Sequence, residues 1–448
     1  MIRKASKSGI RQLLVLLLCL PTAFCRSWEA GDACPSTIDV VIPGNTWKES
    51  KEPSFDTMTS VHTAMSNCPN ITSLDLRVTL LGCSSWPDRW SFPFSLSGGE
   101  KYPSLQRLRL EGYEYGQSPF NEVSWSGNSR SYLPWYERAA DYILTGNILR
   151  EWRYRKLPRE QREKSNIQLW LDAMDWSKVE ELAILGYYGK GTELFLNSTP
   201  SVLTGLRRLE LESEYQGAAL RFLQNVQNDS LTHLVWKDYF NSTLPSIVQQ
   251  FQGSSLQHLE LHTLESDHVE SPAFSASELE PLQHMPNLTH LSLNVARNGS
   301  WPLEMLSAIS QIRSLRSADL WLDIASTCRK QKVENWYFDP EDVGCAGEDQ
   351  YLLPFINEST TLEVFKHMRA NKVGNELSNV TFWGGDWSRA WDGPIYSPPW
   401  IEHKQTKVVC VVVDDQGAGG EECVVLTGVD YWRPRPKGRN YYWDDEDV

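Results

Sequence analysis

Several patterns that would indicate catalysis or a membrane span are missing from this sequence. It contains no G-x-S-x-G, H-E-x-x-H, P-loop or G-x-G-x-x-G motif, so it lacks common signatures of hydrolases, metalloproteases and nucleotide-binding enzymes. It has no C-x₂-C or mixed Cys/His spacing that would suit zinc. After residue 25 no run approaches the ~18 apolar residues of a transmembrane helix. We therefore expect a soluble protein with no catalytic, cofactor-binding or metal-binding residues.

Positive charge is also scarce. The chain has 43 Lys and Arg against 57 Asp and Glu, and its formal net charge is −14. Such an acidic balance argues against binding to nucleic acid or to an anionic membrane surface. It favours solubility, and it suits a basic or carbohydrate-bearing partner. We expect the partner to be a protein or a cell-wall glycan.

Residues 1–25 have the layout of a secretory signal peptide. Four basic residues precede an apolar run at Leu13–Leu20, and Ala23, Phe24 and Cys25 place small residues at a cleavage site. The run is too short to span a bilayer, and an uncleaved signal anchor is the alternative. Removing the four positive charges would take the net charge from −14 to −18. We expect a secreted protein, extracellular or associated with the cell wall.

N-x-S/T sequons are a second indication of secretion. Eight occur in the chain, several of them in polar turns, which is typical of a glycosylated secretory protein. The one at Asn379 is left out because it lies inside a predicted strand. The predicted glycosylation sites are Asn70, Asn197, Asn228, Asn241, Asn287, Asn298 and Asn357.

Cysteine usage agrees with secretion. Removing the signal peptide leaves seven of the nine cysteines, and in an oxidising compartment neighbours in the sequence are expected to pair, with one thiol left over. Cys34, Cys68 and Cys83 cluster near the mature N-terminus, and we assign the last two to a disulfide. The predicted disulfide cysteines are Cys68 and Cys83, Cys328 and Cys345, and Cys410 and Cys423.

The phrase L-x-x-L-x-L recurs through the middle of the chain. Four clear copies begin at Leu206, Leu231, Leu256 and Leu288, and related phrases begin at Ile71, Leu105, Val179, Leu315 and Leu377. From Val179 to Leu315 the starting positions advance by 27, 25, 25, 32 and 27 residues, in or near the range of leucine-rich repeats. Helix-like runs lie between them, as at 218–226 and 303–312. We predict an α/β leucine-rich-repeat solenoid, an irregular horseshoe with a parallel sheet on its concave face and a cap at each end.

The predicted domain boundaries follow from where the repeats stop. They are a signal peptide at 1–25, an N-terminal cap at 26–66, a solenoid at 67–382 with insertions at 112–166 and 322–361, and a C-terminal cap at 383–448. The C-terminal cap is predicted as a β-hairpin of 407–413 and 423–429, with a plausible cross-strand disulfide and an acidic tail. The basic segment 150–164 is either a solvated insertion or a docking segment for an acidic partner. Residues 166–176 read as a strand or a short helix.

The repeat pattern predicts where a ligand would bind. The last two leucines of each phrase point into the core, and the residue between them faces outward on the concave side. Because parallel strands lie about 4.8 Å apart, equivalent residues form ladders. One ladder runs from Asp75 and Arg109 through Glu210 to Thr381, and a second runs from Arg77 to Trp321. The predicted ligand-binding surface is Glu210, Glu212, His233, Lys237, His258, Glu260, His262, His290, Asn294, Asp319 and Trp321.

Two sets of side chains on this surface have more than one interpretation. His233, His258 and His290 occupy the same slot in consecutive repeats, so they form a metal site, a pH-sensitive patch or a half-buried polar row. The chain has 19 Trp, and the group Trp383, Trp387, Trp391 and Trp400 either stacks on sugars or packs in the core and cap.

The irregular repeats and the phrases at 169–176 and 179–182 resemble leucine-rich-repeat proteins of filamentous fungi, many of them labelled F-box-like. The resemblance covers roughly residues 65–385 and implies the solenoid fold. F-box proteins of this type are intracellular ubiquitin-ligase adaptors with a helical F-box ahead of the repeats. Here a signal peptide and a Cys-bearing cap occupy that place, so the ubiquitin role is not carried over.

Three hypotheses about function remain. The first is a secreted, glycosylated leucine-rich-repeat binding protein that is non-catalytic and recognises a protein or glycan ligand on its concave face. The second is a secreted carbohydrate-active enzyme that uses paired carboxylates. The third is an F-box-like ubiquitin-ligase adaptor, if the signal peptide is misread.

Overall fold

The computed structural model describes residues 28–42, 55, 58–78, 94, 96, 98–113, 164–185, 190–212, 216–237, 241–262, 273–296, 299–322, 354–384, 406–413 and 420–427. Several predictions fall outside these residues. They are the signal peptide, Asn298, Cys83, Cys328, Cys345, Trp387, Trp391, Trp400, nearly all of the basic segment, most of both insertions and the acidic tail.

The described strands form one 12-stranded sheet in which spatial order follows sequence order. The strands are β1 (Thr37–Ile42), β2 (Ser73–Val78), β3 (Arg107–Glu111), β4 (Glu181–Leu185), β5 (Arg208–Glu212), β6 (His233–Lys237), β7 (His258–His262), β8 (His290–Val295), β9 (Ser317–Leu322), β10 (Asn379–Gly384), β11 (Thr406–Val413) and β12 (Gly420–Thr427). Neighbours from β1 to β10 are parallel, whereas β11 and β12 are antiparallel to the strands beside them. The nine predicted repeat strands and the C-terminal hairpin are confirmed, and each repeat strand begins two residues after its phrase does.

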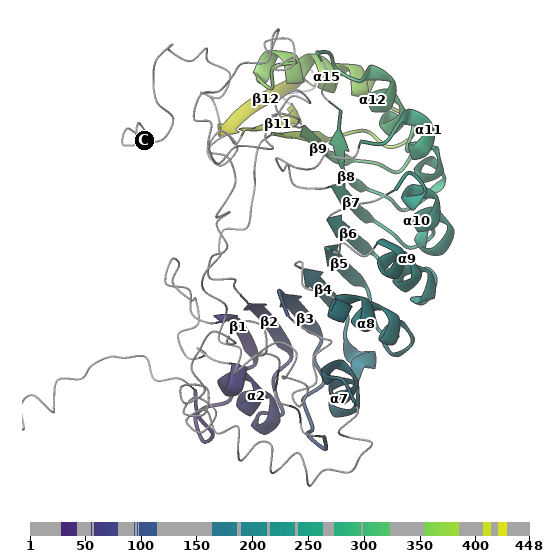
Figure 1. Ribbon diagram of the computed structural model, residues 1–448. Helices are drawn as coiled ribbons and strands as arrows, with labels where there is room; N and C mark the ends of the chain where they lie inside the picture. Colours follow the sequence, from purple (N-terminus) through teal and green to yellow (C-terminus); the bar gives the residue numbers. More distant parts are fainter. Residues whose placement is uncertain are drawn as a thin grey trace, which may run out of the picture.

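Helices cover one face of this sheet. In Figure 1 the strands line the inner side of an arc, and the helices of the repeats lie along its outer side. The helices are α2 (Met58–Asn67), α7 (Asn166–Ala173), α8 (Lys190–Ser198), α9 (Gln216–Asn225), α10 (Leu244–Gln252), α11 (Ala276–Leu279), α12 (Leu303–Ser310) and α15 (Glu358–Ala370). Of the two forms predicted for 166–176, the structure has the helix, because Ser165 and Gln168 form a capping box at its start.

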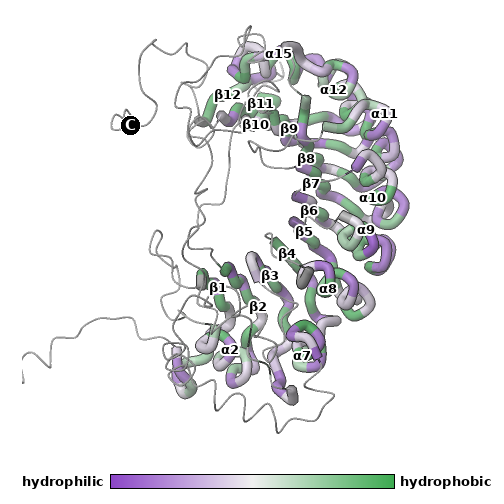
Figure 2. The backbone as a smooth tube through the Cα atoms, in the orientation of Figure 1, coloured by the Kyte–Doolittle hydropathy of each residue, from purple (hydrophilic) through white to green (hydrophobic). Residues whose placement is uncertain are grey.

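A single core lies between the sheet and the helices. Within β6 the side chains of Leu234 and Trp236 are fully buried, while those of His233, Val235 and Lys237 are only half-buried. The same alternation recurs in the first four residues of β5 and β7 because side chains on a strand point to opposite faces in turn. Figure 2 accordingly shows hydrophobic and hydrophilic residues mixed within each element rather than separated into different elements. The uncovered face of the sheet is called the inner face below.

Two disulfides lie at the two ends of the described sheet. Cys410 bonds Cys423, its direct partner in the β11–β12 register, as predicted. Cys68 bonds Cys34, with the two Cα atoms 5.4 Å apart, so the assignment of Cys83 as the partner of Cys68 is wrong. The reason is the strand register: Cys34 precedes β1 and Cys68 precedes β2, and these neighbouring strands are in register.

These bonds are typical of a protein that folds in an oxidising compartment. Within the described ranges, the helices are too short or too polar to cross a lipid bilayer.

Candidate binding site on the inner face

The inner face is built from three columns of side chains that run across the strands in register. The first column holds the leading residues of β2 to β9, which are Ser73, Arg107, Glu181, Arg208, His233, His258, His290 and Ser317. The second column lies two residues further along each strand and holds Asp39, Asp75, Arg109, Ala183, Glu210, Val235, Glu260, Ser292 and Asp319. The third column holds Arg77, Glu111, Glu212, Lys237, His262, Asn294, Trp321 and Trp383.

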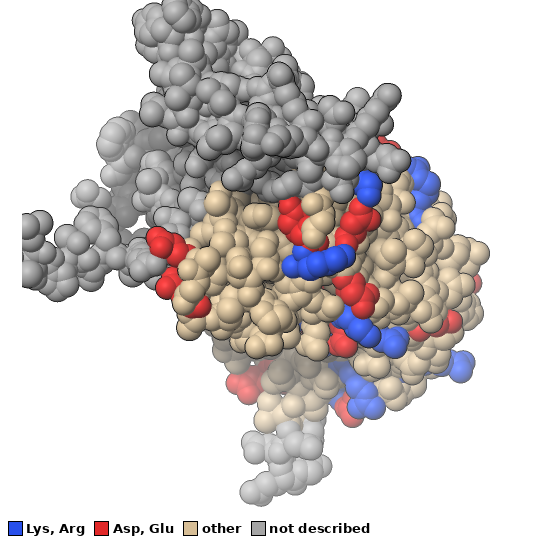
Figure 3. Space-filling model, turned by 90° about the horizontal axis from the view of Figure 1, so that it is seen from below, with Lys and Arg blue, Asp and Glu red and all other residues tan. Residues whose placement is uncertain are grey.

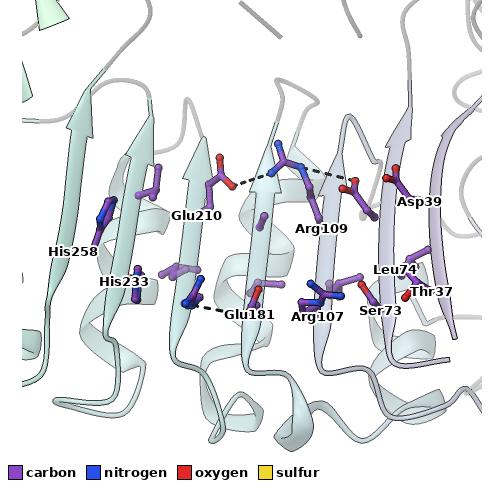
Figure 4. A pocket seen from close by; sticks show the side chains of 17 residues that line it. Thr37, Asp39, Ser73, Leu74, Arg107, Arg109, Glu181, Glu210, His233 and His258 are labelled. Atoms are coloured by element: carbon purple, nitrogen blue, oxygen red, sulfur yellow. Dashed lines mark hydrogen bonds and ion pairs between the residues drawn. The ribbon is translucent and has the colours of Figure 1, made fainter. Parts of the chain in front are cut away.

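A hollow of about 430 Å³ lies over β1 to β7, and the first two columns line it. Its floor includes Ala183, a small side chain between Arg109 and Glu210 in the second column. Arg109 reaches across β4 toward Glu210, while Arg107, Glu181 and the two histidines lie along the lower rim in Figure 4. The hollow therefore exists where a short side chain interrupts a row of long charged ones.

Alternating charges connect the strands beneath and beside this hollow. The guanidinium of Arg77 pairs with Asp39 and lies 3.3 Å from Asp75. Arg109 Nε lies 3.9 Å from the same Asp75 carboxylate, and Arg109 Nη1 lies 3.0 Å from Glu210.

Lys237 Nζ continues the chain by donating to Glu210 over 2.8 Å. Burial alone would lower the pKa of Lys237, but the carboxylates of Glu210 and Glu260 outweigh it and raise that pKa. In Figure 3 basic and acidic groups lie side by side rather than in separate patches. The acids on these strands are thus already neutralised by neighbouring cations.

The three histidines of the first column are neighbours, as the repeat register predicts. The ring centroids of His233 and His258 are 5.4 Å apart, and those of His258 and His290 are 4.2 Å apart with ring planes only 8° from parallel. Within the described part of the chain, no three His, Cys, Asp or Glu side chains converge as a metal site would require.

Each histidine of this stack has a different set of neighbours. His233 Nδ1 hydrogen-bonds the hydroxyl of Thr232 over 3.0 Å, and His290 Nδ1 hydrogen-bonds the hydroxyl of Ser317 over 2.8 Å. Burial lowers the pKa of His233, and the nearby charge of Arg208 and the other two histidines lower it further. Burial and His258 also lower the pKa of His290, although the carboxylate of Asp319 partly opposes them.

Glu260 lies beneath the histidines in the second column. Burial would raise its pKa, but the neighbouring rings of His258 and His262 and the charge of Lys237 outweigh burial and hold that pKa well below its usual range. The ring of His262 lies 2.8 Å from this carboxylate. Glu260 therefore stays ionised and fixed in place.

Flat rings replace ion pairs toward the C-terminal end of the inner face. His262 stacks on Trp321 with centroids 4.1 Å apart, and Trp321 stacks on Trp383 at 4.8 Å. The Lys407 ammonium lies 4.1 Å from the centroid of the Trp383 ring, in a cation–π contact. Because Trp321 and Lys407 occupy the faces of Trp383, this ring packs within the protein and its faces are not open to a sugar. Trp383 thus fits the packing interpretation of the tryptophan group.

The structure places the predicted binding residues in three settings. Glu210, His233 and His258 line the hollow, and Lys237, Glu260, His290, Asp319 and Trp321 are half-buried beside it or further along the inner face. Glu212, His262 and Asn294 are buried. These three are therefore too buried to contribute to a contact surface, and the stacked ring of Trp321 covers one face of the His262 ring.

Six charged residues that line the hollow were not among the predicted binding residues. They are Asp39, Asp75, Arg107, Arg109, Glu181 and Arg208. The sequence signal was present for five of them, because Asp75 and Arg109 stand in the predicted ladder and Arg107, Glu181 and Arg208 occupy the slot of the histidines.

Most predicted glycosylation sites lie away from the inner face. Asn70, Asn197, Asn228, Asn241 and Asn287 are exposed, in turns or on a helix. Asn357 is half-buried as the N-cap of α15, where its side-chain oxygen accepts a hydrogen bond from the Thr360 amide. Glycans at the five exposed positions would leave the hollow open.

Comparison of the chain with models of protein families, with characterised proteins and with solved structures finds no match.

Proposed function

We propose that this chain is a secreted, glycosylated leucine-rich-repeat protein that binds a protein or glycan ligand on its inner face and catalyses no reaction. One observation carries the proposal. The hollow crosses seven strands, and its charged lining is held in place by ion pairs such as Arg109–Glu210. A preorganised polar surface loses little side-chain entropy when a ligand binds, which favours recognition.

The leucine-rich-repeat assignment is supported by three features together. The repeat phrase returns at 25 to 32 residues, its strands run parallel in sequence order, and helices occupy the outer side of the arc. In such solenoids stacked repeats present one long surface, and that surface usually binds a partner. The secretory assignment rests on the signal-peptide pattern, the sequons and the two disulfides.

The state of the acids favours binding over glycoside hydrolysis. A glycosidase needs one carboxyl group with a raised pKa, which donates a proton to the leaving group. Glu260 has the opposite property, and Glu210 is paired with both Arg109 and Lys237. Glu260 therefore lacks the property of a general acid, and Glu210 is held by two cations in an arrangement that suits recognition.

A substitution that fills the hollow tests the proposed function. Ala183→Trp places a large ring on the floor of the hollow, whereas Glu304→Trp places the same ring at an exposed position of α12 on the outer side. Tagged mature protein would be used to capture binding partners from culture medium and cell-wall extract. We expect wild type and Glu304→Trp to retain the same species and Ala183→Trp to lose it. Equal capture by both folded variants would refute binding at the inner face.

A further inference from the structure

The first and second columns of the hollow differ in how much of their charge is already paired. In the second column, Asp75 and Glu210 each lie within 4 Å of a cation, and Arg109 lies between them. In the first column, Arg107 forms no ion pair with a described residue. Arg208 meets only Glu181, at 3.8 Å, and the two side chains are 54% and 44% exposed. The charge still available to a ligand is therefore mainly positive and lies in the first column.

His233 stands next to Arg208 in this column and lines the same hollow. His258 has Glu260 at 3.9 Å, and His290 has Asp319 at 3.6 Å. His233 has no carboxylate in an ion pair among the described residues, and its hydrogen bond is to Thr232. Protonation would thus give His233 a positive charge beside Arg208 that no described acid compensates.

We propose that Arg208, His233 and His258 form an acid-dependent site for the carboxylates of a uronic-acid oligosaccharide. This proposal rests on the proposed function, because it names the ligand class for the same hollow. A carboxylate over β5 and β6 can accept charge-assisted hydrogen bonds from the Arg208 guanidinium and a protonated His233 imidazole. His258 lies beside His233 on the next strand, so its ring can donate a hydrogen bond to the next carboxylate along the first column.

The charge that His233 gains in acid explains the pH dependence. The acids of the hollow are already paired, Asp39 and Asp75 with Arg77, and Glu210 with Arg109 and Lys237. Protonation of His233 adds a positive charge beside Arg208, whereas uronate carboxyls stay ionised near pH 5 because their ordinary pKa is near 4. Other charged groups that face the histidines are Glu260 on β7 and Asp319 on β9.

The strand pairing favours a glycan over an extended acidic peptide. The sheet offers a peptide no backbone partners in this region, because β5, β6 and β7 are paired with each other and with their neighbours. A glycan carboxylate needs only side-chain donors such as those of Arg208 and His233.

The test is calorimetric titration of the mature protein with a hexamer of galacturonic acid near pH 5 and near pH 7.5. We expect binding at least about tenfold tighter at the lower pH, since one linked proton can change affinity tenfold per pH unit. Binding should weaken as sodium chloride is raised. Titration in two buffers of different ionisation enthalpy should show proton uptake on binding. Equal affinity at both pH values, or no binding near pH 5, would overturn the proposal.

Matched variants and ligands sharpen the result. His233→Gln keeps a polar side chain of similar reach but cannot become charged, so it should remove most of the pH dependence. His290→Gln is the control, since His290 lies in the same column, is paired with Asp319 and does not line the hollow. It should change affinity less than about twofold. Equal effects of the two variants would contradict the site.

Two further ligands separate the alternatives. A neutral glucan hexamer that binds as well as the uronate would rule out carboxylate recognition, and a glutamate hexapeptide that binds as well would rule out the glycan class. If the uronate, the glucan and the glutamate peptide all fail to bind, the uronate site is overturned. The proposed function still stands in that case, provided that Ala183→Trp abolishes capture of a different partner. Capture that survives Ala183→Trp would instead remove the proposed function.

Discussion

The two ends of the inner face use the same strand register in different ways. Over β1 to β6 it aligns opposite charges, so that Arg77, Arg109 and Lys237 alternate with acids. From β7 to β11 it aligns flat groups, so that His262, Trp321 and Trp383 stack and Lys407 closes the row. Parallel register therefore fixes which side chains become neighbours across the strands. The residue types at those positions then decide whether the inner face forms a polar hollow or a row of stacked rings.

Each end is also held by its own disulfide, and removing these bonds should give the largest effects. Cys34 and Cys68 are separated by 34 residues, and Cys410 and Cys423 by 13. Loop-closure entropy predicts a loss of about 4 kcal/mol in the free energy of unfolding for the Cys34→Ala/Cys68→Ala variant and about 3 kcal/mol for Cys410→Ala/Cys423→Ala. Urea unfolding would measure both. A larger loss at the C-terminal end would show that packing rather than loop length sets the contribution.

Removing a cation from the ion pairs over β1 to β6 should have the next largest effect on the free energy of unfolding. Arg109→Met removes the cation that lies near Asp75, Glu111 and Glu210, and Glu111 is buried. We expect a loss of about 2 kcal/mol, because the three acids around this guanidinium then lose part of their compensating charge. Arg107→Met, two residues earlier on the same strand, should cost less than about 0.5 kcal/mol. Thermal unfolding of both variants is the measurement, and equal losses would argue against the ion-pair chain.

Breaking the ring end should cost somewhat less. Trp321→Leu removes two stacked contacts and the hydrogen bond to the Ser292 hydroxyl. We expect the free energy of unfolding to fall by about 1.5 kcal/mol. Trp321→Phe keeps an aromatic ring, so it should retain the contribution of stacking and lose only that of the hydrogen bond. Raising the salt concentration should shrink the cost of Arg109→Met and leave that of Trp321→Leu unchanged, because screening acts on charges. The same salt response at both ends would remove the distinction between them.

The smallest effect concerns the histidines, which lie where the two regions meet. Folding lowers the pKa of His233 and His290, so below about 6.5 the unfolded chain binds more protons than the folded one. The free energy of unfolding should therefore fall as the pH drops from about 7.5 toward 5.5. The His233→Gln/His290→Gln variant should show a shallower fall than wild type in urea titrations across this range. Parallel curves would mean that the stack does not titrate.

Local pattern was enough to predict the repeat architecture. The spacing of leucines located the nine parallel repeat strands, and mirrored β-branched runs located the hairpin that joins Cys410 to Cys423. Period-two alternation also predicted that the three histidines are neighbours, as they are. These features depend on neighbours along the chain or one repeat away.

Features that depend on exact side-chain fit were out of reach. The bond between Cys34 and Cys68 requires knowing that the segment around residues 37–42 joins the sheet as its first strand. The burial of Asn294 and His262 depends on what lies over the third column. The hollow depends on side chains from seven strands, Ala183 among them, whose fit decides whether space remains. Periodicity alone carries no such information.

The most direct test of the account is to map where the captured partner lies. Diethyl pyrocarbonate modifies accessible histidines, and mass spectrometry gives the rate for each one with and without the captured partner. We predict that the partner protects His233 and His258, which line the hollow, and leaves the exposed His284 on the outer side unchanged. Protection of His284 with unchanged modification of His233 and His258 would contradict binding at the inner face.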